Sequence, residues 1–323
     1  MENIDSLQLI ILPTEKCNFR CTYCYENFVL GRMNQETLSN VKSLISNLSN
    51  EVKKFSIGWF GGEPLLAKKE VLDICLHSQE VAQKQNLEFK SSMTTNGFLL
   101  DSETLVSLVA VGVDTFQITL DGPEELHNTT RVKVNGGDTY STILNNLITA
   151  RDSDLDFTCT LRLHYNLENY GAIKAWLQTI NREFGNDKRF KLMPKDIGRY
   201  GGQNDSKITP VSFQDKLRIE DELSKVLNKA NVVSFDDAYV CYAAKLNSFV
   251  IRSDGRIAKC TVALNSTYND IGHLTDIGMS IDSEKLFDWV QGSFSGDRRE
   301  LSCPNSILKD NQYKSDIDIV NLS

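Results

Sequence analysis

The sequence predicts an α/β protein built on a parallel sheet, and three observations carry this prediction. Six short apolar or β-branched stretches alternate with amphipathic helical stretches as far as residue 194. Unusual polar tetrapeptides follow several of these stretches, at the carboxyl ends of the expected strands. After Pro194 the alternation stops. Periodicity alone permits either a partial barrel or a doubly wound sheet.

Each expected element has a pattern of its own. The first strand is the apolar run LQLIILP at residues 7–13, which is typical of a buried strand. The helix after it, at residues 34–48, places five aliphatic side chains on one face. We expect the remaining strands at residues 55–60, 89–95, 115–120, 156–163 and 189–193, and the remaining helices of this part at residues 70–85, 102–111, 140–151 and 170–184.

A polar, glycine-rich stretch at residues 196–208 divides the chain. We place a domain boundary there, between residues 1–200 and residues 201–323. The second part shows a helix at residues 210–230, a hairpin that turns on Asp254-Gly255, and a helix at residues 283–291. This pattern predicts a small C-terminal α+β subdomain.

Composition excludes several classes of protein. The 35 basic and 43 acidic residues give a net charge of −8, which argues against nucleic acid as a partner. There is no run of eighteen apolar residues, so we expect no membrane span. The N-terminus lacks a secretory signal, so the eight cysteines are expected in a reducing cytoplasm, where thiols bind metal.

Three of these cysteines, Cys17, Cys21 and Cys24, lie within eight residues just after the first strand. Thiolates are soft ligands, so an iron–sulfur cluster or zinc is expected. A structural zinc ion needs four ligands, and none of the four histidines lies near this loop in sequence. A cubane held by three cysteines would leave one iron free to bind a small molecule.

The Cys-x3-Cys-x2-Cys spacing, with Tyr23 before the last cysteine, resembles the radical S-adenosylmethionine (SAM) superfamily. The resemblance implies a [4Fe–4S] cluster whose open iron is chelated by SAM. It also implies a flavodoxin- or ferredoxin-type reductant, whose electron cleaves SAM to a 5′-deoxyadenosyl radical. Together with the count of six units, it favours a partial (β/α)6 TIM-like barrel with a lateral opening.

The resemblance extends to the GGEP element at residues 61–64 and to the segment at residues 121–131. Glu63 is suited to accept from the SAM ammonium, and Arg131 to pair with the SAM carboxylate. His164, just past the fifth strand, is the candidate catalytic residue. The residues that the resemblance or their strand-end position assigns to SAM are Tyr23, Gly62, Glu63, Asn96, Thr119, Arg131 and Leu192.

The C-terminal part carries Cys241, Cys260 and Cys303. Their spacing resembles the first half of the SPASM extension, or its shorter twitch form, which binds auxiliary iron–sulfur clusters. No cysteine follows Cys303, so the chain supports one auxiliary cluster at most. The alternative is a degenerate extension with free buried thiols. Cys75 and Cys159, in apolar surroundings, are expected to be inert.

These features predict a radical SAM enzyme that abstracts hydrogen from a side chain of a precursor peptide or a protein. The expected outcome is a crosslink, an epimerisation or an oxidation in ribosomal peptide maturation. Because the first strand begins near residue 7, we expect no N-terminal leader-binding domain.

Two alternatives remain. One is an anaerobic sulfatase maturase, in which an aspartate commonly follows the cysteine that matches Cys260; this chain has Thr261 there. The other is a non-catalytic iron–sulfur or zinc scaffold. Loss of the SAM pocket would indicate this class of protein.

Overall fold

A computed structural model describes residues 5–48, 52–227 and 239–310. All six predicted strands are present and form a parallel sheet, in which each pairs in register with the next along the chain. They are β1 (Ser6–Ile11), β3 (Lys54–Trp59), β4 (Glu88–Thr95), β5 (Val113–Leu120), β7 (Thr158–Tyr165) and β8 (Phe190–Asp196). The α/β fold class is therefore confirmed.

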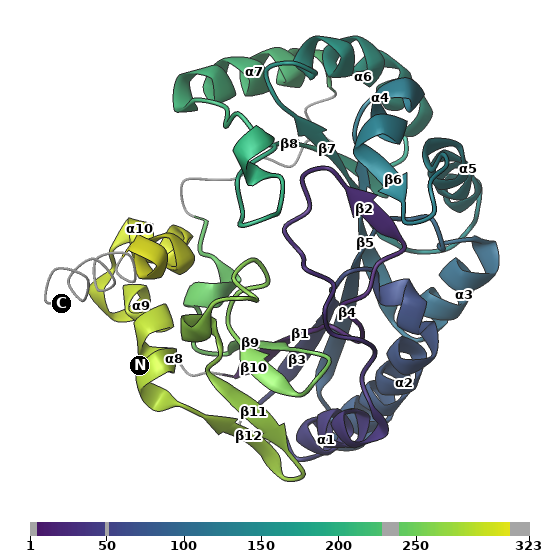
Figure 1. The fold of residues 1–323 in the computed structure, drawn as a ribbon. Helices are drawn as coiled ribbons and strands as arrows, with labels where there is room; N and C mark the ends of the chain where they lie inside the picture. The colour runs from purple at the N-terminus through teal and green to yellow at the C-terminus, as the bar shows by residue number, and fades with distance from the viewer. Residues whose placement is uncertain (1–4, 49–51, 228–238, 311–323) are drawn as a thin grey trace, which may run out of the picture.

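The helices that follow these strands along the chain cover the outer face of the curved sheet (Figure 1). They are α1 (Gln35–Ser46), α2 (Lys68–Gln85), α3 (Ser102–Ala110), α5 (Tyr140–Arg151), α6 (Tyr170–Phe184) and α7 (Phe213–Val226). Each confirms a predicted helix, although the predicted end of α7 lies outside the described residues. The short helices η1 (Pro64–Ala67) and α4 (Glu124–Thr130) were not predicted. No helix in the described ranges is long and apolar enough to cross a membrane.

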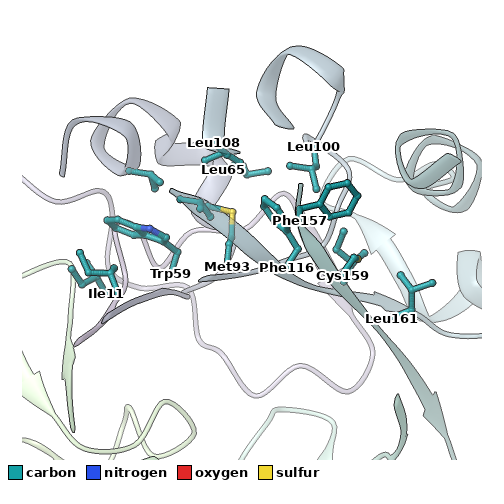
Figure 2. Close-up of a cluster of buried hydrophobic side chains, with 14 of the residues drawn as sticks. Ile11, Trp59, Leu65, Met93, Leu100, Leu108, Phe116, Phe157, Cys159 and Leu161 are labelled. Carbon is teal, nitrogen blue, oxygen red and sulfur yellow. The ribbon is translucent and has the colours of Figure 1, made fainter. Parts of the chain in front are cut away.

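The main core lies between the sheet and these helices, and it fixes which strand residues face inward. Trp59, Phe116, Phe157 and Cys159 gather on the outer face of the strands (Figure 2), where each is at most 3% exposed. Side chains alternate along a strand, so their neighbours on β5 and β7 face the inside of the barrel. Cys75 and Cys159 are both buried, as predicted.

A second, two-stranded sheet lies on the inner side of the barrel (Figure 1). It pairs β2 (Phe19–Cys21), within the cysteine loop, with β6 (Arg131–Lys133), and Cys21 lies opposite Arg131. Neither strand was predicted, because three residues are too few to show a period. This pairing attaches the cysteine loop to a segment more than one hundred residues later.

The C-terminal part extends the barrel sheet instead of forming a sheet of its own. The predicted hairpin is present, and its first strand pairs in parallel with β1. The added strands are β9 (Ser248–Ile251), β10 (Arg256–Ala258), β11 (Gly272–Thr275) and β12 (Gly278–Ile281), followed by α8 (Ser283–Val290), α9 (Gly292–Ser295) and α10 (Arg298–Ser302). The proposed boundary near residue 200 falls between β8 and α7.

A buried ion pair also joins the C-terminal part to the cysteine loop. Arg252, just after β9, donates from Nε and Nη2 to the two carboxylate oxygens of Glu15, at 2.9 and 2.7 Å. Their side chains are 6% and 1% exposed. A third bond runs from Arg252 Nη1 to the Leu264 carbonyl, at 2.7 Å. Removal of either partner would leave a buried charge without compensation.

We therefore expect Arg252→Met to lower the free energy of unfolding by about 3–5 kcal/mol, because Glu15 then stays buried and unpaired. The double variant Glu15→Gln with Arg252→Met should recover part of this loss. The control is Arg256→Met, which breaks a half-exposed pair with Asp254 and should cost about 1 kcal/mol or less. Urea denaturation of the metal-free protein measures the free energy of unfolding of all three variants. An equal loss of stability in Arg252→Met and Arg256→Met would contradict the assigned role of the buried pair.

Candidate active site

The three N-terminal cysteines line one cavity of about 150 Å³ on the inner side of the barrel. Local bonds shape their loop: Phe19 N donates to Cys17 Sγ at 3.3 Å, and Cys24 N donates to the Cys21 carbonyl at 3.1 Å. Pairing of β2 with β6 then fixes Cys21. The side chains of Asn96, Thr119 and other strand-end residues form the opposite wall.

The three thiols suit a cluster better than a single metal ion. Burial is the main cause that raises the pKa of each thiol, so three thiolates here need a bound cation. Among the residues that the structure describes, no three His, Cys, Asp or Glu side chains are placed to share one metal ion. In a [4Fe–4S] cluster each thiolate binds a different iron, so the three thiols do not need to surround one metal ion.

The GGEP turn packs directly against the backbone of the cysteine loop. Glu63 N donates to the Lys16 carbonyl at 3.0 Å. A Cβ atom on Gly62 would lie 2.5 Å from the same oxygen, and one on Gly61 would lie 2.2 Å from the Thr14 carbonyl. Only glycine allows this approach. The turn therefore holds the loop against the cavity wall.

Glu63 has a different place from the one expected. It is fully buried and is not among the residues that line the cavity. Its carboxylate accepts from Leu65 N at 3.0 Å, Thr95 Oγ1 at 2.7 Å and Asn96 N at 2.7 Å. These bonds fasten the turn to the end of β4, and a contact between Glu63 and SAM stays a prediction.

A buried hydrogen-bond network organises the wall around Tyr23. The Tyr23 phenol donates to Asp121 Oδ2 at 2.7 Å and accepts from Arg131 Nη1 at 2.9 Å. Thr130 Oγ1 also donates to Asp121 Oδ2, at 2.8 Å. Burial alone would raise the pKa of Asp121, but the nearby His164 and Arg131 hold it below its usual range. Asp121 is thus an ionised anchor that orients Tyr23 and Arg131, both of which line the cavity.

His164 belongs to this network and does not line the cavity. Its Nδ1 lies 3.0 Å from the Tyr23 hydroxyl and 3.3 Å from Asp121 Oδ1, and its ring meets Tyr23 edge-on. Burial lowers the pKa of His164 to about 4, which keeps the ring neutral near pH 7. In this structure His164 contacts Tyr23, and a catalytic role for His164 stays a prediction.

Leu192 is placed differently from the other predicted SAM contacts. It lies opposite Leu161 on β7, and both are buried in the core between the sheet and the helices. The structure gives no support to a side-chain role for Leu192 in SAM binding. The other expected residues, Tyr23, Gly62, Asn96, Thr119 and Arg131, all line the cavity.

The three C-terminal cysteines also come together. Cys241 precedes a short helical turn, Cys260 follows β10, and Cys303 follows α10. Their thiols lie close enough for the charges of Cys241 and Cys303 both to raise the pKa of Cys260, after the larger effect of burial. Asn269 fixes the Cys260 loop, since its Oδ1 accepts from Lys259 N and Cys260 N at 3.0 and 2.9 Å.

A larger cavity of about 420 Å³ lies beside this second group of cysteines. Its wall includes Val262 and Ala263, just after Cys260, and Asn305, just after Cys303. Tyr25 lines this cavity and also the cavity of the N-terminal cysteines. Burial and the charges of both Cys24 and Cys260 raise the Tyr25 pKa. Tyr25 is therefore near one cysteine of each group.

A sequence model of the radical SAM superfamily matches residues 11–180, more than half of the chain. The chain belongs to the radical SAM superfamily. The match contains the cysteine loop, the GGEP turn and Arg131. The protein is therefore an enzyme that uses a [4Fe–4S] cluster and SAM.

Several curated proteins are similar in sequence. The cysteine-type anaerobic sulfatase-maturating enzyme of Clostridium perfringens strain 13 is 24% identical over 320 residues, which cover 89% of this chain and 83% of the relative. The S-adenosylmethionine-dependent nucleotide dehydratase of Pseudoalteromonas ulvae is 28% identical over 136 residues, or 38% of this chain and 42% of the relative. The first similarity thus extends into the C-terminal part.

Solved structures show the same fold. The enzyme anSMEcpe with bound AdoMet and Kp18Cys peptide has a TM-score of 0.65 at 21% identity, over 87% of this chain and 80% of its own. SuiB of Streptococcus suis bound to precursor peptide SuiA has a TM-score of 0.59 at 18% identity, over 81% and 61%. At these identities the likeness concerns the fold alone.

In this radical SAM enzyme Cys17, Cys21 and Cys24 would hold the cluster. The wall residues that would bind SAM are the predicted ones, Tyr23, Gly62, Asn96, Thr119 and Arg131. The predicted site residues did not include Asp121, Tyr25 and Arg162. Asp121 lies in the tetrapeptide TLDG after β5, so its strand-end position was a usable signal. Tyr25 and Arg162 carried no motif, and only the fold places them. Because Gly62, Thr119 and Arg131 line one cavity, the non-catalytic scaffold loses its support.

The close packing of the GGEP turn gives a first prediction. Gly62→Ala should weaken cluster retention and SAM binding at least about tenfold, because the added methyl group meets the Lys16 carbonyl. Gly31→Ala is the matched control, since a Cβ atom there meets nothing within 4 Å. In both variants, iron content measures cluster retention, and equilibrium dialysis with labelled SAM measures SAM binding. Unchanged SAM binding in the first variant would contradict the close packing.

The histidine behind the cavity gives a pH prediction. Burial, and then Arg131, lower the pKa of His127 from 6.5 to about 4, and its Nδ1 accepts from Asp121 N at 3.2 Å. Between these values the unfolded chain binds a proton that the folded chain does not, so stability falls as the pH drops through this window. From pH 7 to pH 5 His127 alone should cost about 2 kcal/mol.

His127→Asn keeps an acceptor for Asp121 N but removes the titrating ring. The loss of stability between pH 7 and pH 5 should therefore be smaller in this variant by about 2 kcal/mol. Urea denaturation of the metal-free protein at the two pH values measures it. A variant with the same pH dependence as the wild type would show that His127 is already protonated in the folded protein.

Proposed function

We propose that this radical SAM enzyme oxidises a side chain of a peptide or protein substrate, in the manner of sulfatase maturation. One observation carries the proposal: Tyr25 lines both cavities and is near a cysteine of each group, Cys24 and Cys260. The first group would serve SAM cleavage. The second would hold one auxiliary iron–sulfur cluster, placed to accept an electron from a substrate between them.

The larger cavity suits a peptide. Amide and hydroxyl groups of Asn265, Ser266 and Asn305 can pair with peptide N–H and C=O groups, and Tyr200 and Tyr268 offer aromatic surface. The solved structures of similar fold include anSMEcpe with the Kp18Cys peptide and SuiB with precursor peptide SuiA. Both support a peptide substrate for this chain.

The bound cluster and SAM, reduced by a flavodoxin- or ferredoxin-type protein, would supply the 5′-deoxyadenosyl radical. A substrate carbon would give up one hydrogen atom to that radical. The substrate would then lose one proton to solvent and one electron to the auxiliary cluster that Cys241, Cys260 and Cys303 would hold. For a cysteine substrate the product is a thioaldehyde, which water converts to the aldehyde with release of hydrogen sulfide. Tyr23 and Arg131 would hold SAM so that this carbon meets the radical.

Sulfatase-type oxidation stands ahead of a crosslink because the similarity to the sulfatase-maturating enzymes covers 89% of this chain. This order reverses the expectation from the sequence. Peptide crosslinking remains the second candidate, because sulfatase maturases commonly have an aspartate where this chain has Thr261. The Thr261 hydroxyl lies 2.8 Å from the Tyr242 hydroxyl.

The test is product analysis after anaerobic reconstitution. With SAM, a reductant and a cysteine peptide taken from a sulfatase, we expect 5′-deoxyadenosine and a peptide in which oxygen replaces sulfur. Loss of two hydrogens with sulfur retained would favour the crosslink. Turnover of SAM with no peptide changed, across sulfatase peptides and peptides encoded beside this gene, would contradict a peptide substrate.

The auxiliary cluster has a test of its own. The triple variant Cys17→Ala, Cys21→Ala, Cys24→Ala should retain iron and sulfide after reconstitution, bound by the C-terminal cysteines. The matched variant Cys241→Ala, Cys260→Ala, Cys303→Ala should also retain iron and should still cleave SAM. Iron-free protein in the first case would show that the C-terminal thiols hold no cluster, and would remove the proposed electron acceptor.

A further inference from the structure

Arg162 lines the cavity of the N-terminal cysteines, where its Nε has no hydrogen-bond partner among the described residues. It is on β7, between Leu161 and Leu163, which are buried in the outer core, so its side chain faces the inside of the barrel. It is paired in register with Thr119 of β5, and both residues line the cavity of the N-terminal cysteines. The guanidinium therefore enters the site at the level where SAM is expected.

Within the described residues, no hydrogen bond or ion pair satisfies this guanidinium. Its Nε is buried and has no hydrogen-bond partner. Other cations near it have partners: Lys195 and Lys216 lie 3.2 and 3.1 Å from Asp196 Oδ1, and Arg131 donates to Tyr23, although the Arg131 Nε is also buried without a partner. A buried guanidinium nitrogen without an acceptor is costly, and such sites are commonly completed by a bound anion.

Arg162 lines the same cavity as Tyr25, and Tyr25 also lines the larger cavity. Burial and then Asp196 raise the pKa of Tyr200, and the positive charge of Arg162 opposes this rise. Tyr200 lines the larger cavity, and its ring meets that of Tyr25 at a centroid distance of 6.0 Å. Arg162 thus lies where the SAM cavity approaches the proposed peptide cavity.

We propose that Arg162 binds a carboxylate of the substrate, from an aspartate or glutamate next to the residue that is modified. This inference rests on the proposed peptide substrate. Arg131 already offers its guanidinium to the expected SAM carboxylate, so a second arginine at the junction is available for a second anion. Guanidinium and carboxylate pair through two parallel hydrogen bonds, which would fix the position of the reacting carbon.

The test compares two pools of short synthetic peptides, each with one central cysteine. In the acidic pool the flanking residues are aspartate or glutamate, and in the neutral pool they are asparagine or glutamine. Binding to the reconstituted, SAM-loaded enzyme is measured with the clusters oxidised, so that no turnover occurs. The variants are Arg162→Gln and Arg162→Lys. Lys191→Gln is the charge-matched control, because Lys191 is exposed on the neighbouring strand and outside the cavity.

We expect the wild type and Lys191→Gln to bind the acidic pool about ten- to a hundredfold more tightly than the neutral pool. Arg162→Gln should lose this preference, and Arg162→Lys should keep part of it, while both variants retain iron. Equal binding of both pools by the wild type would overturn the role of Arg162 and leave the peptide substrate standing.

Three other outcomes also test the proposal. If Arg162→Gln still prefers the acidic pool, another cation binds the carboxylate, which contradicts the inference. A large loss of SAM affinity in Arg162→Gln would assign the guanidinium to SAM instead. If neither pool binds the wild type, the proposed peptide substrate fails, and the inference fails with it.

Discussion

Close backbone packing between the GGEP turn and the cysteine loop is the constraint on which the active site depends. Two glycines let the turn approach the Thr14 and Lys16 carbonyls, and Glu63 fastens the same turn to the end of β4. From the other side, β6 pairs with β2 and brings Arg131 opposite Cys21. The loop is thereby fixed at the carboxyl ends of the parallel strands, where this barrel class places its chemistry. The cavity in front of it needs only the cofactors to be complete.

A second constraint sets the place of the C-terminal cysteines. Strand β9 pairs with β1, and the buried pair between Arg252 and Glu15 ties the segment after β9 to the start of the cysteine loop. The C-terminal part thus continues the barrel sheet on the side of β1. This attachment places Cys260 near Tyr25, and so brings the second group of thiols to a cavity that shares a wall residue with the first. The proposed electron transfer from substrate follows from this arrangement.

The sequence allowed the six strands, their helices, the hairpin after residue 247 and the three N-terminal cysteines to be predicted, because each has a local period or spacing. Contacts between distant segments have no such signal. The pairing of Cys21 with Arg131 was therefore not predicted, nor was the bond between Arg252 and Glu15. His164 was expected to face the site because it ends a strand, but the ionised Asp121 draws its ring to Tyr23. Glu63 was expected at SAM, but three buried donors occupy its carboxylate.

In this protein three thiolates would leave one iron open in a cavity that the residues expected to bind SAM also line. Electron paramagnetic resonance of the reduced variant Cys241→Ala, Cys260→Ala, Cys303→Ala, which keeps only the N-terminal cluster, tests it most directly. Addition of SAM should change the signal of this cluster, because the SAM amino and carboxylate groups bind its open iron. A signal that is the same with and without SAM would contradict the binding of SAM to an open iron of this cluster.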